Sequence, residues 1–275
     1  MNSVFSVFTD VTLNGFPLWI IALLCAGVFL ASFMDAIAGG GGIISVPVYL
    51  MVFGGMPTYF VLGTNKFSAG IGTVFSTARF IRKGFVDWSL CIPAAILSML
   101  GSISGTWLQH RTPDAVLKYL LLFILPVIAV VTLRGRSWPD EVTETLSSAR
   151  RRLIVCTAAL LIGCYDGYYG PGTGTFLMLV FVRLARMDTR HAAGCAKVIN
   201  LASNIGGICS ALAAGYVLLG VGAAAAVFSV LGHWLGAGLA IKNGSRLVRP
   251  AVVAVLLLLT AKILTELLFP SFWNG

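Results

Sequence analysis

The chain has 275 residues, of which 58% are hydrophobic and only 11% are charged, and its mean hydropathy is +0.93. Charged residues make up about a quarter of a soluble globular domain. This composition therefore excludes a soluble enzyme or binding domain and indicates an all-α polytopic membrane protein. The net charge of +9 does not predict a nucleic-acid partner, because the basic residues lie between apolar segments, where they act as topology signals.

Apolar stretches predict ten membrane segments, five in each half of the chain, or about 8–10 spans if the short ones do not cross. In chain order they cover 17–34, 43–55, 62–81, 88–109, 115–133, 153–165, 174–187, 192–213, 217–240 and 248–269. We expect a first transmembrane repeat over 1–133, a cytoplasmic linker over 134–152 and a second repeat over 153–275. Segments 43–55 and 174–187 are shorter than the ~20 residues that a spanning helix needs, so they are expected to be re-entrant or broken.

The two halves repeat each other at a constant offset of 131 residues. Asp35-Ala-Ile-Ala-Gly39-Gly-Gly-Gly42 recurs as Asp166-Gly-Tyr-Tyr-Gly170-Pro-Gly172-Thr-Gly174, and Lys66 recurs as Lys197. An odd number of segments in each half places the two repeats in opposite orientations in the membrane.

The placement of basic residues agrees with this inverted topology. With the N-terminus outside, fourteen of the 19 basic residues fall on the cytoplasmic side. They are Arg79, Arg82, Lys83, Arg134, Arg136, Arg150, Arg151, Arg152, Arg183, Arg186, Arg190, Lys242, Arg246 and Arg249. Both termini are therefore predicted to be periplasmic.

The two glycine-rich breaks predict a ligand site near the middle of the membrane. A helix that restarts after each break presents unpaired N–H groups and the positive end of its dipole, which attract anions. The candidate backbone residues are Gly40, Gly41, Gly42, Gly172, Thr173 and Gly174. The alternative is that the glycines serve only to pack helices against one another.

Lys66 and Lys197 lie in apolar helices, where an ammonium group needs a partner. They are the main candidates for binding an anionic substrate. Asn200 and Asn204 share one polar stripe with Lys197, which is expected to face the interior of the bundle, and Asn65 is adjacent to Lys66. The alternative is a permanent structural Lys–Asp pair within each half.

Asp35 and Asp166 are candidate counter-ions, helix caps or proton carriers, and the sequence does not separate these roles. Tyr168 and Tyr169 give the second motif hydroxyl groups that the first motif lacks. Gly101-Ser-Ile-Ser-Gly105 and Gly232-His-Trp-Leu-Gly236 are interpreted as helix-packing motifs. His233 is interpreted as a polar residue satisfied at a helix interface, with a proton relay as the alternative.

These motifs resemble the TauE/SafE sulfite exporter family, also called the toluenesulfonate uptake permease (TSUP) family. The resemblance rests on Asp35 to Pro47 with Gly63-Thr-Asn-Lys66, and on Asp166 to Gly174 with Ala196-Lys197-Val198-Ile199-Asn200, and it covers nearly the whole chain. It implies transport of sulfite, sulfoacetate or another organosulfonate across the bacterial inner membrane, in a direction that differs between members.

The expected function is therefore a proton-coupled secondary transporter, or permease, for a small sulfur-containing anion. A carrier or channel for another organic anion, such as a carboxylate, is the alternative within transport, and an intramembrane enzyme or an assembly factor is the alternative from another class. No cofactor, metal or catalytic residue is predicted. The expected partners are the small anionic substrate and the lipid bilayer, and the oligomeric state is not predicted.

Overall fold

The computed structural model describes residues 12–243 except 54, 114 and 118–145. Nearly all of segment 115–133, most of the linker and segment 248–269 lie outside the described residues. The rest is mostly helical, as predicted. In chain order its helices are α2 (Leu18–Ala38), α3 (Gly42–Val52), α4 (Thr58–Arg82), α5 (Trp88–Arg111), α7 (Ser148–Tyr168), α8 (Thr173–Arg183), α9 (Thr189–Ala213) and α10 (Leu219–Asn243).

One short segment directly before α2 departs from the all-α prediction. Strands β1 (Thr12–Leu13) and β2 (Phe16–Pro17) pair antiparallel around Asn14 and Gly15, whose φ angles are 53° and 83°. An Asn-Gly pair with two positive φ angles is the preferred two-residue hairpin turn. The Asn14 side chain accepts a hydrogen bond from the Val221 N–H at 3.2 Å, which ties this hairpin to the start of α10.

Four of the described helices are long and apolar enough to cross a bilayer: α2, α5, α9 and α10. Helices α3 and α8 have 11 residues each, which at 1.5 Å per residue is about 16 Å, half the hydrocarbon thickness. Their prediction as short segments is confirmed. Helices α4 and α7, with 25 and 21 residues, have the length to span, but polar and basic side chains lower their hydropathy.

Helix α7 begins five residues earlier than its apolar stretch predicted. The Ser147 side chain caps it by accepting from the Arg150 N–H, and Arg150 to Arg152 form its first turns. Arginine is a good helix former, so helix formation continues past the point where hydropathy ends. These residues are helical although the sequence assigned them to the linker.

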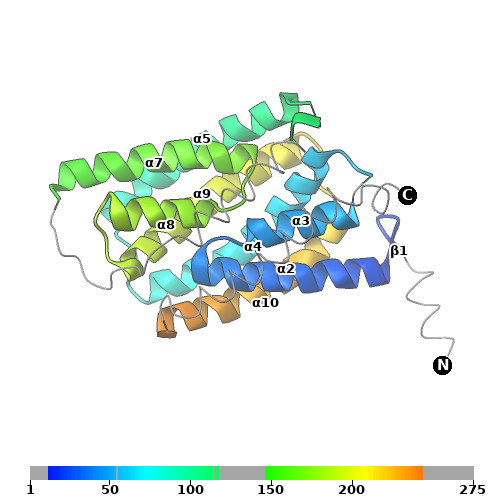
Figure 1. Cartoon of the computed structure of the whole chain (residues 1–275), viewed down its shortest axis with the longest axis horizontal. Coiled ribbons are helices and arrows are strands. Elements are labelled where there is room, and N and C mark those ends of the chain that lie inside the picture. Colours follow the sequence, from blue (N-terminus) through cyan, green and yellow to red (C-terminus); the bar gives the residue numbers. More distant parts are fainter. Residues whose placement is uncertain (1–11, 54, 114, 118–145, 244–275) are drawn as a thin grey trace, which may run out of the picture.

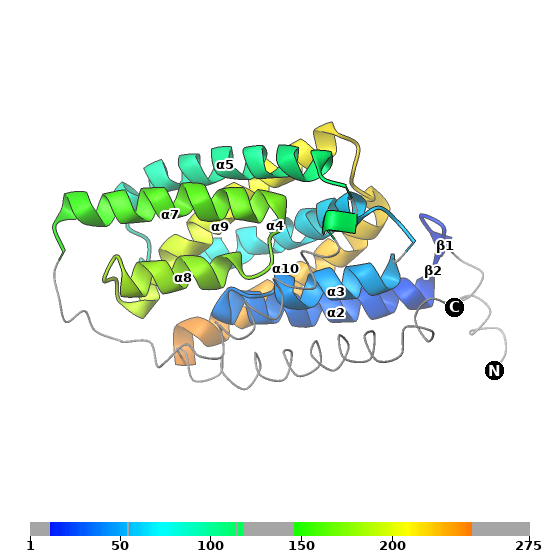
Figure 2. The ribbon, with the colours of Figure 1, turned by 45° about the horizontal axis from the view of Figure 1, so that its top comes forward.

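Each short helix folds back along the helix before it, and the two resulting hairpins enter the bundle from opposite ends (Figures 1 and 2). In the first hairpin a Cβ on Gly27 of α2 would lie 2.7 Å from Val48 of α3. In the second, the Arg151 guanidinium of α7 donates to the carbonyl of Ala185, just after α8, at 3.1 Å. The tips of both hairpins therefore lie inside the bundle.

Close helix contacts recur at the 131-residue offset with the halves exchanged. Gly101 and Gly105 of α5 lie against the backbone of α7 at Leu160 and Cys164, and Gly232 and Gly236 of α10 lie against α2 at Phe29 and Phe33. A side chain at any of these glycines would meet a backbone carbonyl, so the prediction that both motifs pack helices is confirmed.

The two ends of the bundle differ in charge. Arg79 and Arg82 near the end of α4, Arg150 to Arg152 at the start of α7, Arg183 at the end of α8 and Lys242 near the end of α10 share the end at which α9 begins (Figures 1 and 2). Contacts agree with this placement, because the Arg190 guanidinium lies 5.8 Å from the Phe85 ring centre in the α4–α5 turn. Exposed leucine, isoleucine, valine and tryptophan side chains cover the outer faces of the helices, as a lipid environment requires.

Candidate functional site

The tips of the two hairpins touch at the glycines of the repeated motif. Gly39 ends α2 with φ 75°, and a Cβ placed there would lie 2.6 Å from the carbonyl carbon of Gly174. A Cβ on Gly42 would lie 2.8 Å from Pro171 Cα, and the Thr175 N–H donates to the Gly39 carbonyl at 2.7 Å. The breaks predicted from two distant parts of the sequence therefore form one contact, named here the glycine seam.

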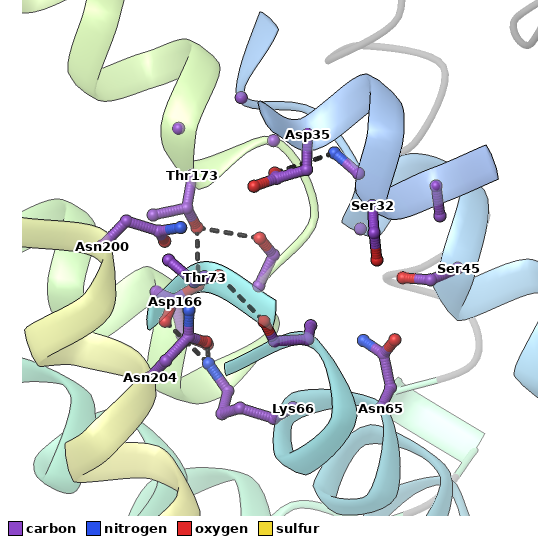
Figure 3. A pocket seen from close by; sticks show the side chains of 18 of the residues that line it. Ser32, Asp35, Ser45, Asn65, Lys66, Thr73, Asp166, Thr173, Asn200 and Asn204 are labelled. Atoms are coloured by element: carbon purple, nitrogen blue, oxygen red, sulfur yellow. Dashed lines mark hydrogen bonds and ion pairs between the residues drawn. The ribbon is translucent and has the colours of Figure 1, made fainter. Parts of the chain in front are cut away.

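A cavity of about 60 Å³ lies beside the glycine seam and is lined by residues of α2, α3, α4, α7, α9, α10 and both breaks. A buried water needs about 10–15 Å³ by this measure, so the cavity has room for roughly four to six waters or one small polyatomic ion. Figure 3 shows Ser32, Ser45 and Asn65 on one side of the open space and Lys66, Asp166 and Asn204 on another.

Most of the predicted site residues line this main cavity. They are Asp35, Gly41, Gly42, Asn65, Lys66, Asp166, Tyr169, Gly172, Thr173, Gly174, Asn200 and Asn204. Three predicted residues do not. Lys197 lines a separate cavity of about 20 Å³ with Asn200 and the two seam glycines, and Gly40 and Tyr168 line neither cavity.

The reasons for these departures are local. The Tyr168 hydroxyl donates to Thr112 Oγ1 at 3.2 Å, so this tyrosine faces the end of α5 and only its neighbour Tyr169 reaches the cavity. Lys197 lies seven positions before Asn204 on α9. Lys197 lines the small cavity and Asn204 lines the main cavity, and the glycine seam lies between the two cavities. The predicted polar stripe of α9 therefore divides between two cavities.

Three carboxamide side chains line the main cavity without a hydrogen bond to any residue that the structure describes. Asn65 of α4 and Asn200 and Asn204 of α9 have no side-chain hydrogen bond to any residue that the structure describes, although each is more than nine-tenths buried. Asn65 Oδ1 is a buried acceptor without a partner among these residues. Buried polar groups are usually hydrogen-bonded, so this wall is built to bind a polar ligand or water.

Both lysines form ion pairs, and both pairs join the two halves. Lys66 Nζ lies 2.7 Å from Asp166 Oδ2 and 2.6 Å from the Asp166 carbonyl oxygen. Lys197 Nζ lies 2.8 Å from Asp35 Oδ2 and also donates to the Asp35 carbonyl oxygen. The Lys–Asp pairing of the alternative is thus present, but its placement within each half is wrong, because the crossing hairpins bring each aspartate to the lysine of the other repeat.

The two aspartates differ in their remaining partners. Asp166 accepts from Thr173 Oγ1 at 2.8 Å and from Ser203 Oγ at 2.6 Å. Asp35 accepts from the Gly41 N–H at 3.0 Å, and its Oδ2 lies 3.2 Å from His233 Nε2. Two of the helix-start N–H groups expected to face a ligand are thus already bonded, that of Gly41 to Asp35 and that of Thr173 to the Gly170 carbonyl at 3.3 Å.

Sequence reasoning missed Ser203 as a site residue and favoured a packing role for His233 over the alternative of a proton relay. Ser203 follows Asn200 by three positions on α9, which is a helical neighbour spacing and was an available signal. His233 lies inside a glycine motif interpreted as packing. Its Nδ1 does bond the Ser229 carbonyl at 3.0 Å, as a satisfied interface residue would, but its other nitrogen reaches Asp35.

The family model described as "Sulfite exporter TauE/SafE" matches residues 24–263. Three similar relatives are named as probable membrane transporter proteins. The ORF9 protein of Sinorhizobium sp is 34% identical over 257 residues, covering 93% of this chain and 97% of the relative. A Haemophilus influenzae protein is 37% identical over 248 residues, covering 89% and 94%. The YfcA protein of Escherichia coli K12 is 32% identical over 241 residues, covering 86% and 87%. No solved structure is significantly similar to the chain.

Proposed function

We propose that this chain, which belongs to the sulfite exporter TauE/SafE family of membrane transporters, is a secondary transporter for a small sulfur-containing anion in the bacterial inner membrane. The observation that carries the proposal is the main cavity at the glycine seam, where Lys66 and three unengaged carboxamides line a buried space. Amide N–H groups and an ammonium are the donors that a sulfite or sulfonate oxygen accepts from.

The size of the cavity supports a small substrate within this class. Sulfite or methanesulfonate fits a space of about 60 Å³, whereas an aromatic sulfonate needs the walls to move apart. Burying a ligand between two repeats at the middle of the membrane is the common arrangement of secondary transporters.

The lysines bind the substrate by exchanging partners in this proposal. Each ammonium is bonded to an aspartate, and each pair links one hairpin to the long helix of the other repeat. An anion entering the cavity competes with Asp166 for Lys66, which loosens the link between the halves. Lys197 takes the same role on the other side of the glycine seam, so the substrate passes from one lysine to the other.

The proposal includes two repeats of opposite orientation in the membrane, with both termini on the periplasmic side. Support comes from hairpins that enter from opposite ends of the bundle and from the gathering of basic residues at one end. That end is the cytoplasmic one under the positive-inside rule. The re-entrant arrangement leaves irregular backbone only at the seam, where it lies inside protein beside a polar cavity.

A carrier for a small carboxylate such as acetate is the second candidate, because its oxygens accept from the same donors. Thermal unfolding of the purified protein with sulfite, methanesulfonate, sulfoacetate, acetate and chloride separates the two. A ligand at one hundred times its Kd stabilises the folded state by about 2.7 kcal/mol, a readily measured shift. We expect stabilisation by the sulfur anions above that by acetate, and equal or greater stabilisation by acetate would favour the second candidate.

Variants locate the site. Lys66→Ala and Lys197→Ala are each expected to weaken anion binding at least tenfold, while the exposed lysine at the end of α4, in the variant Lys83→Ala, serves as the matched control. Unchanged affinity in both site variants would refute the proposed role of the lysines.

A further inference from the structure

The four charged groups of the two ion pairs leave the site without net charge. Lys66 is balanced by Asp166 and Lys197 by Asp35, and all four side chains are at most 15% exposed. An anion that enters this site must compete with Asp166 and Asp35 for the two lysines, because each lysine is already paired at 2.7–2.8 Å. An additional positive charge would make this site attract an anion.

His233 is placed to supply that charge. It lies on α10 and is 1% exposed, and its Nε2 is 3.2 Å from Asp35 Oδ2, the same oxygen that Lys197 bonds at 2.8 Å. At the 131-residue offset its counterpart is Ser102, which cannot carry a charge. Among the described residues, the Asp35 pair therefore has a histidine neighbour that the Asp166 pair lacks.

The shortest contact of each ring nitrogen of His233 is with an acceptor oxygen, the Ser229 carbonyl at Nδ1 and the Asp35 carboxylate at Nε2, while the Ser229 hydroxyl lies farther from Nδ1, at 3.4 Å. Nδ1 lies 3.0 Å from the Ser229 carbonyl, which only accepts, so Nδ1 donates. Nε2 faces the carboxylate of Asp35, which also only accepts when ionised. Its other neighbour, Thr73 Oγ1 at 3.4 Å, already gives its hydrogen to the Ala69 carbonyl. An imidazole with two donor nitrogens is the cationic form, so these acceptor oxygens can accommodate a positive charge on His233.

Few charged side chains other than Asp35 lie near the His233 imidazole. Helices α2 and α4 pack against α10, and α2 contributes Asp35. From α4, Arg79 donates to the carbonyl of Trp234, next to His233, and Lys66 lines the same main cavity. Lys197 reaches Asp35 from α9. In the part of the chain that the structure describes, Asp35 is the only carboxylate in contact with His233.

We propose that His233 is the proton-coupling residue of the transport cycle, an inference that rests on the proposed function. A proton from water binds Nε2 and gives the site one net positive charge, which attracts one monovalent anion. When the proton leaves Nε2 to water on the other side, the site returns to zero and the anion is released. One proton and one anion then move together, and no net charge crosses the membrane. Histidine suits this step because its charge changes between pH 5 and 8.

Uptake of methanesulfonate into proteoliposomes tests this coupling, because methanesulfonate keeps one negative charge throughout this pH range, unlike sulfite. For the wild-type protein we expect a gradient of one pH unit, acid outside, to accumulate the anion about tenfold, and a membrane potential to have no effect. For His233→Gln we expect the pH gradient to lose its effect. Because the variant site keeps no net charge, we expect it to bind methanesulfonate at least tenfold more weakly. Its remaining uptake should follow an inside-positive potential instead, with about tenfold accumulation for about 60 mV, since the anion would cross alone.

The chain has three histidines, so His110→Gln and His191→Gln are matched controls and should behave as the wild type. Pure potential-driven uptake by the wild type, or gradient-driven uptake by His233→Gln, would overturn the inference and leave the proposed function standing. If the wild type neither binds nor transports methanesulfonate or sulfite, the proposed function itself fails.

A measurement on the unmodified protein keeps the inference testable if His233→Gln does not fold. Binding of methanesulfonate in weakly buffered detergent solution should take up a proton from the medium, approaching about one per anion toward the alkaline end of the range from pH 6 to 8. An indicator dye reports this uptake. Anion binding without proton uptake over that range would refute the inference.

Discussion

The glycine seam predicts a graded series of stability losses when its glycines are replaced by alanine. Two physical effects are separable. Gly39 has φ 75°, and a Cβ there would also lie 2.6 Å from the Gly174 backbone. Gly174 has the steric effect alone, since it lies in α8 and its Cβ would be 2.6 Å from Gly39 Cα. Gly215 has φ 74° and nothing within 4 Å, so it has the conformational effect alone.

The magnitudes follow from these environments. A left-handed conformation costs an alanine about 1–2 kcal/mol, and overfilling a packed contact costs about 1–3 kcal/mol. We therefore expect losses of about 1–2 kcal/mol for Gly215→Ala, about 1–3 for Gly174→Ala and about 2–5 for Gly39→Ala. The obstructing atoms at the seam are backbone atoms, which cannot rotate away as a side chain would.

Reversible unfolding in detergent, followed by circular dichroism, measures these losses, and methanesulfonate binding by the same samples reports the cavity. Gly215→Ala should bind normally, because it lies in the α9–α10 turn away from the seam. Gly174→Ala and Gly39→Ala should lower affinity, because the seam forms a wall of the cavity. If Gly174→Ala were as stable as the wild type and bound the anion equally well, the two hairpin tips would not be in contact as described.

Three further outcomes are expected. Asp166→Asn should destabilise the protein by about 3–5 kcal/mol, because the Lys66 ammonium is left buried without its counter-charge, and adding Lys66→Gln should recover most of this loss in thermal unfolding. Equal stability of the single and double variants would contradict that pairing. Ser203→Ala should cost about 1–2 kcal/mol through loss of the 2.6 Å bond to Asp166, and no measurable change would show that water replaces it. Asn204→Ala should weaken methanesulfonate binding by at least threefold in a titration, whereas Tyr168→Phe should not; the reverse order would place the cavity elsewhere.

The repeated motif predicted much of this site because glycines and buried charges affect the chain through their immediate sequence neighbours. Glycine-rich breaks end helices wherever they occur, so the short helices α3 and α8 followed directly from the sequence. Lysine and asparagine in an apolar helix must face the interior, so Lys66, Asn65, Asn200 and Asn204 were identified correctly as buried. Helix ends were less certain because arginines at the start of α7 extend a helix that hydropathy does not detect.

Partner choice could not be predicted in the same way. Lys66 and Asp166 are 100 residues apart, and nothing in their local sequence distinguishes this pairing from one within a half. His233 and Asp35 are 198 residues apart, and the packing motif around the histidine concealed its contact.

The sequence by itself determined the environment, the duplication and the kinds of side chain at the centre of the bundle, since hydropathy, glycine breaks and buried charges each act through local physics. Only the tertiary structure decided which charges meet. Two hairpins entering from opposite ends bring each aspartate to the lysine of the other repeat and divide the predicted site into two cavities at the glycine seam. Contacts between distant segments depend on how the helices cross, and that geometry is set by the packing of the whole bundle.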